Sequence, residues 1–188
     1  MLSRLGLLAG LLAAACASSP DRFYTLSTLP DADAGPSATP TMHVLLNVTI
    51  PQLVDRSEMV VSTSRNEILV LDHERWAIAL SDHVAQTLAR DIERRRPDIL
   101  IGDRAFDQTG SPPVTVKVDI VRMSVQRGAQ ASIEARWRIA DPGAGTDELG
   151  STALQVPVGD GDYSAIARAY SQALSALADK LAGGIRRR

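Results

Sequence analysis

The residue types that perform covalent catalysis are few and scattered in this sequence. A nucleophilic site requires a serine or cysteine beside a histidine, with an acidic side chain that orients the imidazole. The chain has one cysteine, Cys16, and no Gly-x-Ser-x-Gly segment that would place a serine on a sharp turn. The spacing of the three histidines, His43, His73 and His83, assigns them to no common pocket. We therefore expect no catalytic residues and no enzymatic activity.

Metal and cofactor sites also lack their usual patterns. A single thiol excludes every zinc site that needs several cysteines, and the zinc-protease pattern His-Glu-x-x-His is absent. Gly143-Ala144-Gly145 falls in a turn that we expect between two strands, whereas a phosphate-binding glycine loop joins a strand to a helix. The sequence therefore predicts no bound metal and no cofactor.

Length and composition indicate one ordinary globular domain. The 188 residues are 45% hydrophobic and 22% charged, and a chain of this length can fold without disulfides or metals. The 20 basic and 22 acidic side chains give a net charge of −2, so no large positive field attracts a phosphate backbone. A role in binding nucleic acid is therefore not expected.

The first residues have the pattern of a bacterial secretion signal. Arg4 precedes an apolar run from Leu5 to Leu12, which is too short to span a bilayer, and small residues follow it. The run ends at Cys16 in a segment that resembles a lipobox, the motif whose cysteine is lipidated and becomes the new N-terminus. Ala13 departs from that motif, which usually has leucine there. The alternative is an ordinary secreted protein whose only cysteine falls at this place by chance.

The expected lipid anchor also predicts a location. Several acyl chains on Cys16 would hold the mature chain far more firmly than one chain does. In bacterial lipoproteins an aspartate after the lipidated cysteine typically retains the protein at the inner membrane, whereas Ala17 and Ser18 follow here. We therefore predict a lipid-anchored protein on the periplasmic face of the outer membrane.

The sequence predicts one folded domain after an N-terminal arm, and the strands and helices that would position any site belong to that domain. We expect a signal peptide over residues 1–15, a lipidated arm and loop over 16–41 with a short strand near 23–27, a domain over 42–185, and a basic tail over 186–188. Apolar runs and period-two patterns predict strands at 44–50, 59–64, 68–71, 99–101, 114–125, 131–139 and 151–156. After Ile120 the apolar phase moves by one residue, which indicates a β-bulge.

Two amphipathic helices complete the pattern. The first precedes Pro97, and its arginines at 94–96 match the negative end of the helix dipole, so we interpret them as a solvated helix end. The second begins after Asp162 and is expected to end with Gly183-Gly184 as a cap. Hairpin-linked strands with two such helices predict an α+β fold: a two-layer sandwich, a mostly antiparallel sheet with both helices packed on one face.

Several short motifs occur in a regular order along the mature chain. Phe23-Tyr24-Thr25-Leu26 comes early, Pro51 closes a strand, Leu53-Val54-Asp55-Arg56 leads into a hairpin, and Arg75-Trp76 precedes the first helix. With the lipoprotein signal and the strand Ala135-x-Trp137-x-Ile139, they resemble the PqiC/YmbA family of ABC-type transport auxiliary lipoproteins. The loop over residues 30–40 departs from the family pattern without touching the expected core.

The resemblance implies a function that the residues alone do not show. It implies a non-enzymatic periplasmic component of a lipid-transport or envelope-integrity system, anchored in the outer membrane. The implied partners are MCE-domain proteins, which form hydrophobic conduits for lipids, and ABC transporter components. Self-association into a ring is implied as well. In this scheme the protein is a docking element for a periplasm-spanning partner.

Four residues are candidates for a partner or self-association surface: Pro51, Asp55, Arg56 and Trp76. Asp55 and Arg56 could pair across a subunit interface or form an ion pair within their own turn. Trp76 could contact a partner, because tryptophan is enriched in strong interfaces, or it could fill the core beside the first helix.

Two other functions stay open at this point. An outer-membrane lipoprotein of this kind could bind and assist a protein of envelope assembly or cell-wall synthesis. A lipid-anchored hydrolase would instead need a pocket with perturbed titratable groups.

Overall fold

The computed structural model of the protein describes residues 19–28, 39–102, 110, 112–159 and 161–186. Its larger sheet has five strands in the order β5-β2-β6-β7-β8. Strand β2 (Met42–Thr49) pairs in parallel with both β5 (Ile99–Ile101) and β6 (Val114–Val125). Strands β7 (Gln130–Asp141) and β8 (Thr146–Pro157) extend the sheet in the antiparallel sense, as two long hairpins.

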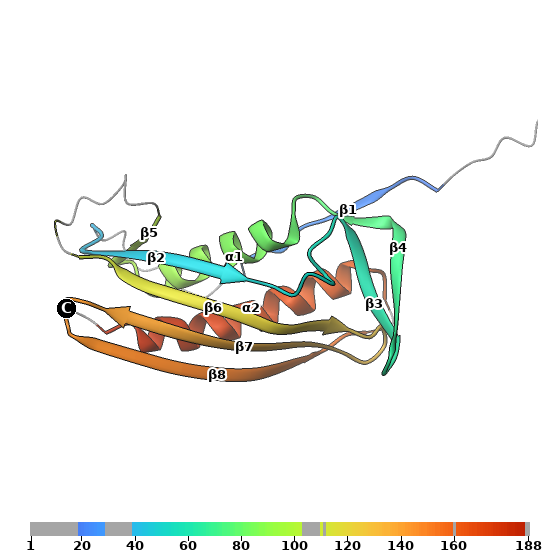
Figure 1. Ribbon diagram of the computed structural model, residues 1–188. Coiled ribbons are helices and arrows are strands. Elements are labelled where there is room, and N and C mark those ends of the chain that lie inside the picture. Colours follow the sequence, from blue (N-terminus) through green and yellow to red (C-terminus); the bar gives the residue numbers. More distant parts are fainter. Residues whose placement is uncertain (1–18, 29–38, 103–109, 111, 160, 187–188) are drawn as a thin grey trace, which may run out of the picture.

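A smaller sheet stands at one end of the molecule, opposite the C-terminus (Figure 1). Its order is β1-β4-β3, from β1 (Arg22–Tyr24), β3 (Glu58–Ser64) and β4 (Glu67–Trp76). The hairpin β3-β4 turns at Arg65-Asn66, as the sequence predicts. The sequence pattern did not separate this hairpin from the main sheet, because a pattern of alternating residues fixes which side chains share a face and leaves the neighbouring strand undetermined.

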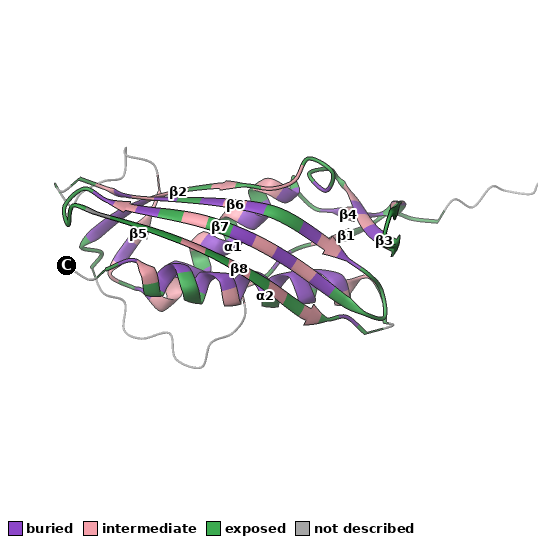
Figure 2. Cartoon of the chain, turned by 60° about the horizontal axis from the view of Figure 1, so that its bottom comes forward, coloured by how far each residue is buried: buried purple, intermediate pink, exposed green. Residues whose placement is uncertain are grey.

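Both helices cover the same face of the five-stranded sheet, which confirms the predicted α+β sandwich. Helix α1 (Leu80–Arg95) lies along β2 and β5, helix α2 (Ser164–Gly184) lies along β7 and β8, and the helices contact each other. Figure 2 shows the alternation of buried and exposed residues along the strands. Inward side chains such as Val116 and Ile133 have no exposed surface, so the core lies between this face and the helices.

The parallel neighbours of β2 are a feature that the sequence did not predict. Helix α1 carries the chain back to the end where β2 begins, so β5 runs beside β2 in the same direction. The two longest ladders, β6-β7 and β7-β8, are antiparallel, so the sheet is mixed and its greater part is antiparallel. The predicted bulge is confirmed, since the β6-β7 register shifts between Ile120 and Arg122.

The expected glycine cap of α2 is wrong. Gly183 and Gly184 are the last two residues of the helix, and its C-cap residue is Ile185, whose backbone is extended. A Cβ placed on Gly184 would lie 2.7 Å from Cδ1 of Ile139, closer than real Cβ contacts come. Gly184 therefore serves the close approach of α2 to β7, and not a left-handed turn.

The arginines at the end of α1 are also more than a solvated helix end. Arg96 is 6% exposed and donates hydrogen bonds to the carbonyl oxygens of Ala182 (3.1 Å) and Ile185 (2.5 Å) at the end of α2. Its Nη2 also lies 2.7 Å from Oδ2 of Asp98. The two helices end side by side, so one guanidinium satisfies carbonyls that the last turn of α2 leaves without an intrahelical donor.

Candidate functional site

The connection between β2 and β3 contains three of the four candidate contact residues. Pro51 follows β2, and its carbonyl oxygen accepts hydrogen bonds from the amides of Val54 (3.1 Å) and Asp55 (3.2 Å). The side chain of Val54 is buried and fixes this turn to the core, whereas Leu53 is 56% exposed. The turn therefore presents a defined surface between the two sheets.

Asp55 has a structural partner inside the chain. Its Oδ1 accepts a hydrogen bond from the amide of Ser81, in the first turn of α1, at 3.1 Å. The N-cap residue of that helix is Ala79, which has no side-chain oxygen to offer. Asp55 thus supplies from a distant loop the capping oxygen that a helix start requires, and its charge matches the positive end of the helix dipole.

Arg56 and Trp76 differ sharply in exposure. Arg56 is exposed, and its Nε lies 3.1 Å from Oε2 of Glu58. The pKa of Glu58 is lowered by its own backbone amide and by Arg56. Trp76 is only 4% exposed, and its ring lies 6.4 Å from that of Tyr170 in α2. Burial removes Trp76 from any contact surface of the folded chain, and its place is in the core.

Substituting Asp55 tests its capping role. We expect Asp55→Ala to lower the free energy of unfolding by about 1 kcal/mol, because the Ser81 amide loses its acceptor. Asp55→Asn keeps a side-chain oxygen and is expected to lose much less. Urea unfolding followed by circular dichroism gives both values. Equal losses in the two variants would contradict the capping role.

The three histidines lie apart and have separate partners. Nε2 of His43 lies 3.1 Å from the carbonyl oxygen of Gly102, and Nδ1 of His73 lies 2.9 Å from Oδ1 of Asp21. His83, in α1, is 8% exposed. The histidines come from β2, β4 and α1, and none of these interactions joins one to a serine or to another histidine. The arrangement resembles no nucleophile and base pair.

His83 instead attaches the N-terminal segment to the domain. Its Nε2 accepts a hydrogen bond from the amide of Leu26 at 3.2 Å. The amide of Ser27 donates to Oγ of Ser171 in α2 at 3.1 Å. Tyr24 donates to Oε2 of Glu74 at 2.5 Å, and burial together with that carboxylate raises the pKa of Tyr24 to about 12. The segment from β1 onward is therefore docked against both helices and the small sheet.

This attachment is expected to weaken in acid. Burial, and then the charge of Arg90, lower the pKa of His83 below its usual value of 6.5. The unfolded chain therefore takes up this proton at a higher pH than the folded chain, so His83 stabilises the fold above about pH 6.5 and the contribution is lost as pH falls toward the lowered pKa. We expect the melting temperature of His83→Gln to fall less between pH 7 and pH 5 than that of the unsubstituted chain. Identical pH profiles would contradict this role for His83.

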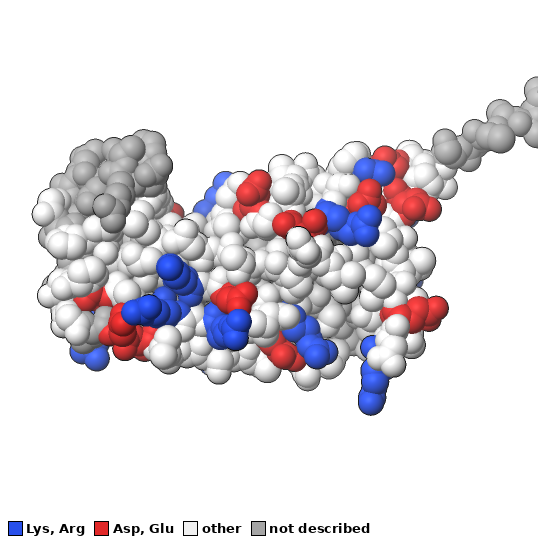
Figure 3. Space-filling model, viewed as in Figure 1, with Lys and Arg blue, Asp and Glu red and all other residues white. Residues whose placement is uncertain are grey.

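A groove of about 510 Å³ crosses the outer face of the five-stranded sheet, which no helix covers. Arg136 pairs with Asp119 at 2.7 Å, Arg138 pairs with Asp147 at 2.5 Å, and Leu149 on the groove wall is 78% exposed. The hydrogen bonds from Arg136 lower the pKa of Asp119. On the face shown in Figure 3, most basic side chains have an acidic side chain beside them. The two groove arginines, Arg136 and Arg138, are therefore each held by a carboxylate of a neighbouring strand.

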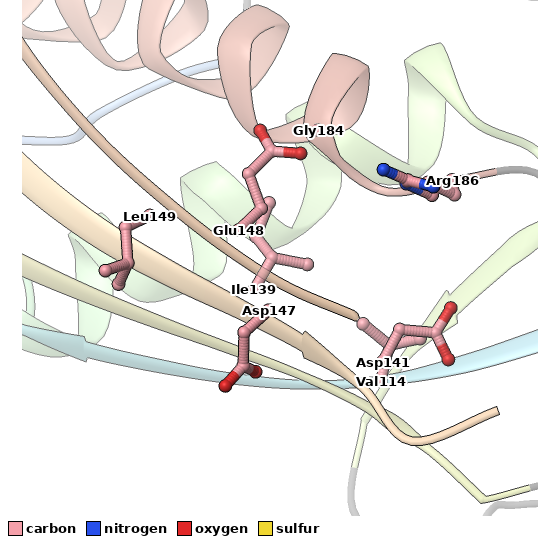
Figure 4. Close-up of a pocket in the computed structure, with 8 residues that line it drawn as sticks. All are labelled: Val114, Ile139, Asp141, Asp147, Glu148, Leu149, Gly184 and Arg186. Atoms are coloured by element: carbon pink, nitrogen blue, oxygen red, sulfur yellow. The ribbon is translucent and has the colours of Figure 1, made fainter. Parts of the chain in front are cut away.

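A second pocket, of about 240 Å³, lies beside the end of α2 (Figure 4). The Glu148 carboxylate points toward Gly184, and Oδ1 of Asp141 accepts hydrogen bonds from the amides of Gly143 and Ala144 in its own turn. Within the described part of the chain, no group of three or more His, Cys, Asp and Glu side chains could hold a metal ion. Of the acidic residues that line this pocket, Asp141 thus contacts its own turn, Glu148 lies against the end of α2, and Asp147 pairs with Arg138.

Comparisons with solved structures support the fold. The crystal structure of an uncharacterized protein matches with a TM-score of 0.72 at 15% identity, over 89% of this chain and 99% of that chain. The crystal structure of a protein from Xanthomonas campestris matches with a TM-score of 0.63 at 18% identity, over 86% of this chain and 91% of that chain. No curated protein matches the sequence.

None of the helices in the described residues is long and apolar enough to cross a membrane.

The family is established by sequence. The model of one family, the ABC-type transport auxiliary lipoprotein components, matches residues 24–182, which include the whole five-stranded sheet, β3 and β4 of the small sheet, and nearly all of α2. The chain therefore belongs to the family of ABC-type transport auxiliary lipoprotein components.

Proposed function

We propose that this protein is an outer-membrane lipoprotein that serves, without enzymatic activity, as the docking element of an MCE and ABC-type lipid transport system. The observation that carries the proposal is the family, which is that of auxiliary components of ABC-type transport. The lipobox-like segment before Cys16 supports the anchor, and the residues after it favour the outer membrane. The exposed turn after β2 supports docking, because a rigid surface loop suits recognition of a partner.

The anchor is tested at Cys16, which lies outside the described residues. We expect the mature chain to begin at an acylated Cys16, and we expect Cys16→Ser to move the protein from the outer-membrane fraction to the soluble periplasmic fraction. Mass spectrometry of the N-terminal peptide and density fractionation of the envelope measure these two outcomes. A mature chain that begins elsewhere with a free thiol would refute the anchor.

The docking surface is proposed to include the exposed parts of Pro51 and Arg56. Asp55 borders this surface, but its substitution also removes the cap of α1, so Arg56→Glu is the sharper test. The matched control is Arg122→Glu, which breaks an exposed pair with Glu134 (3.1 Å) on the outer face of the large sheet. We expect only Arg56→Glu to reduce crosslinking to the partner, because like charges would then face each other at the interface.

The partner itself is identified by co-purification. Tagged full-length protein, crosslinked in intact cells, is expected to bring down an MCE-domain protein, ABC transporter subunits and further copies of itself in a ring. Capture of a cell-wall synthase or an assembly factor in their place would overturn the transport role and favour the alternative. A partnerless monomer with hydrolase activity would overturn the docking role altogether.

A further inference from the structure

Most large apolar side chains that the described residues expose lie at one end of the molecule. They are Phe23, Leu53, Ile68, Leu69 and Ile78, between 41% and 63% exposed, and we call them the tether-end residues. The remaining two, Val121 and Leu149, belong to the five-stranded sheet. Exposed apolar side chains that gather in one region mark a contact surface more often than single ones do.

The fold brings the tether-end residues to the small sheet and the loops beside it. Phe23 is in β1, and Ile68 and Leu69 follow the turn of the β3-β4 hairpin. Leu53 is in the turn that caps α1, and Ile78 is in the link between β4 and α1. The link is joined to β1, because the amide of Ala77 donates a hydrogen bond to the carbonyl oxygen of Tyr24 at 2.9 Å. The small sheet forms the end of the molecule opposite the C-terminus in Figure 1, and these two connections adjoin it.

The chain that leads to the anchor leaves from this same end. Figure 1 shows the described residues before β1, 19–21, at the end of the molecule that carries the small sheet, while the C-terminus lies at the opposite end. Cys16 is three residues before Ser19, the first described residue, and three extended residues span at most about 11 Å. A lipid on Cys16 would therefore keep this end close to the bilayer surface.

Acidic and basic side chains of this end lie next to one another. Asp21 contacts His73 (2.9 Å) and Arg75 (3.4 Å), and Arg22 contacts Glu74 (3.0 Å). Paired charges leave no polybasic surface that would need anionic lipids. Apolar side chains with polar and charged groups of both signs beside them suit the interfacial region of a bilayer.

We propose that the tether-end residues rest in the interfacial region of the lipid bilayer, so that the small sheet faces the membrane and the end with the C-terminus points away from it. The inference rests on the lipidation of Cys16 in the proposed function and adds a fixed orientation to it. A chain held only by its lipids would rotate freely about the residues before β1, whereas a seated end presents one side of the molecule to a partner.

The test uses full-length lipoprotein reconstituted in vesicles of phosphatidylethanolamine, with and without phosphatidylglycerol. Single cysteines replace Leu53, Ile68 or, as the control, Leu149, and each carries a nitroxide label. The acylated Cys16 has no thiol to react with the label. Collisions with oxygen, which concentrates in lipid, are compared with collisions with a water-soluble nickel chelate. We expect a several-fold higher oxygen-to-nickel ratio for Leu53→Cys and Ile68→Cys than for Leu149→Cys, in both lipid mixtures.

Three other results would overturn the inference. Water-exposed labels at all three positions of an acylated protein would show that the lipid anchors the chain while this end does not contact the bilayer. Labels at Leu53→Cys and Ile68→Cys shielded from both reagents would show that protein, such as a second copy, covers this end. An N-terminal peptide without acyl mass would remove the proposed anchor together with the seating. Each labelled variant should first match the unsubstituted chain in its thermal unfolding, since all three positions are exposed.

Discussion

Trp76→Ala is expected to lower the free energy of unfolding by about 3–5 kcal/mol, the range for removing a buried tryptophan side chain. Trp76 is the last residue of β4 and contacts Tyr170 of α2, so its indole joins the small sheet to the helical layer. Removal of the indole ring leaves a cavity between β4 and α2, where the two rings lie 6.4 Å apart. Guanidinium unfolding monitored by circular dichroism measures the loss.

The matched control is Phe23→Ala, on the strand beside it. Phe23 is 63% exposed, so its truncation is expected to change the free energy of unfolding by less than about 0.5 kcal/mol. A Trp76→Ala protein that keeps its stability and loses partner binding would show that Trp76 contacts a partner after all. That result would contradict the assignment of Trp76 to the core.

Arg96→Ala is expected to cost about 3 kcal/mol, because it removes a buried guanidinium and leaves its partners without it. Two carbonyl oxygens at the end of α2 lose their donor, and the carboxylate of Asp98 loses its cation. Lysine cannot replace this geometry, because its ammonium does not offer a planar fork to a carboxylate and two carbonyls at once. Arg96→Lys is therefore expected to lose more than half of the same stability.

The control for Arg96 is Arg90→Ala, an exposed arginine on the same helix. It removes an equal charge without a buried hydrogen bond, so little change in stability is expected. Similar losses at both positions would mean that the charge of α1, and not the contact with α2, stabilises the helix ends. Thermal unfolding of both variants at neutral pH separates the two explanations.

Local patterns predicted the elements well and their neighbours poorly. The alternation in β6 and β7 and the apolar stripe of α1 specify strand, helix and buried face, because each depends on residues close in sequence. The parallel pairing of β2 with β6 depends on contacts between distant residues that no local pattern contains. Gly150 is a further example: a Cβ there would lie 2.3 Å from the ring of Trp137, a requirement set by the neighbouring strand alone.

The role of Asp55 and Arg56 in a contact surface stays a prediction. The sequence placed both residues in a connection between strands, and the structure shows that Arg56 is exposed there. The cap that Asp55 gives to α1 was missed, although one signal was available: Ala79 before Leu80 leaves the helix without a capping side chain of its own. Trp76 shows the limit of residue type as evidence, because tryptophans of cores and interfaces look alike in a sequence.

The placement of β2 between β5 and β6 has a consequence for how the chain folds. Val44 pairs with Val114, about 70 residues later, whereas β6, β7 and β8 follow each other through short turns. Distant pairing closes a large loop and slows folding, so the meander β6-β7-β8 is expected to form before β2 joins it. The chain is synthesised from its N-terminus, so β2 has no hydrogen-bonded neighbour until β5 and β6 have been synthesised. During that interval the apolar residues of β2 are the ones that a chaperone would have to protect.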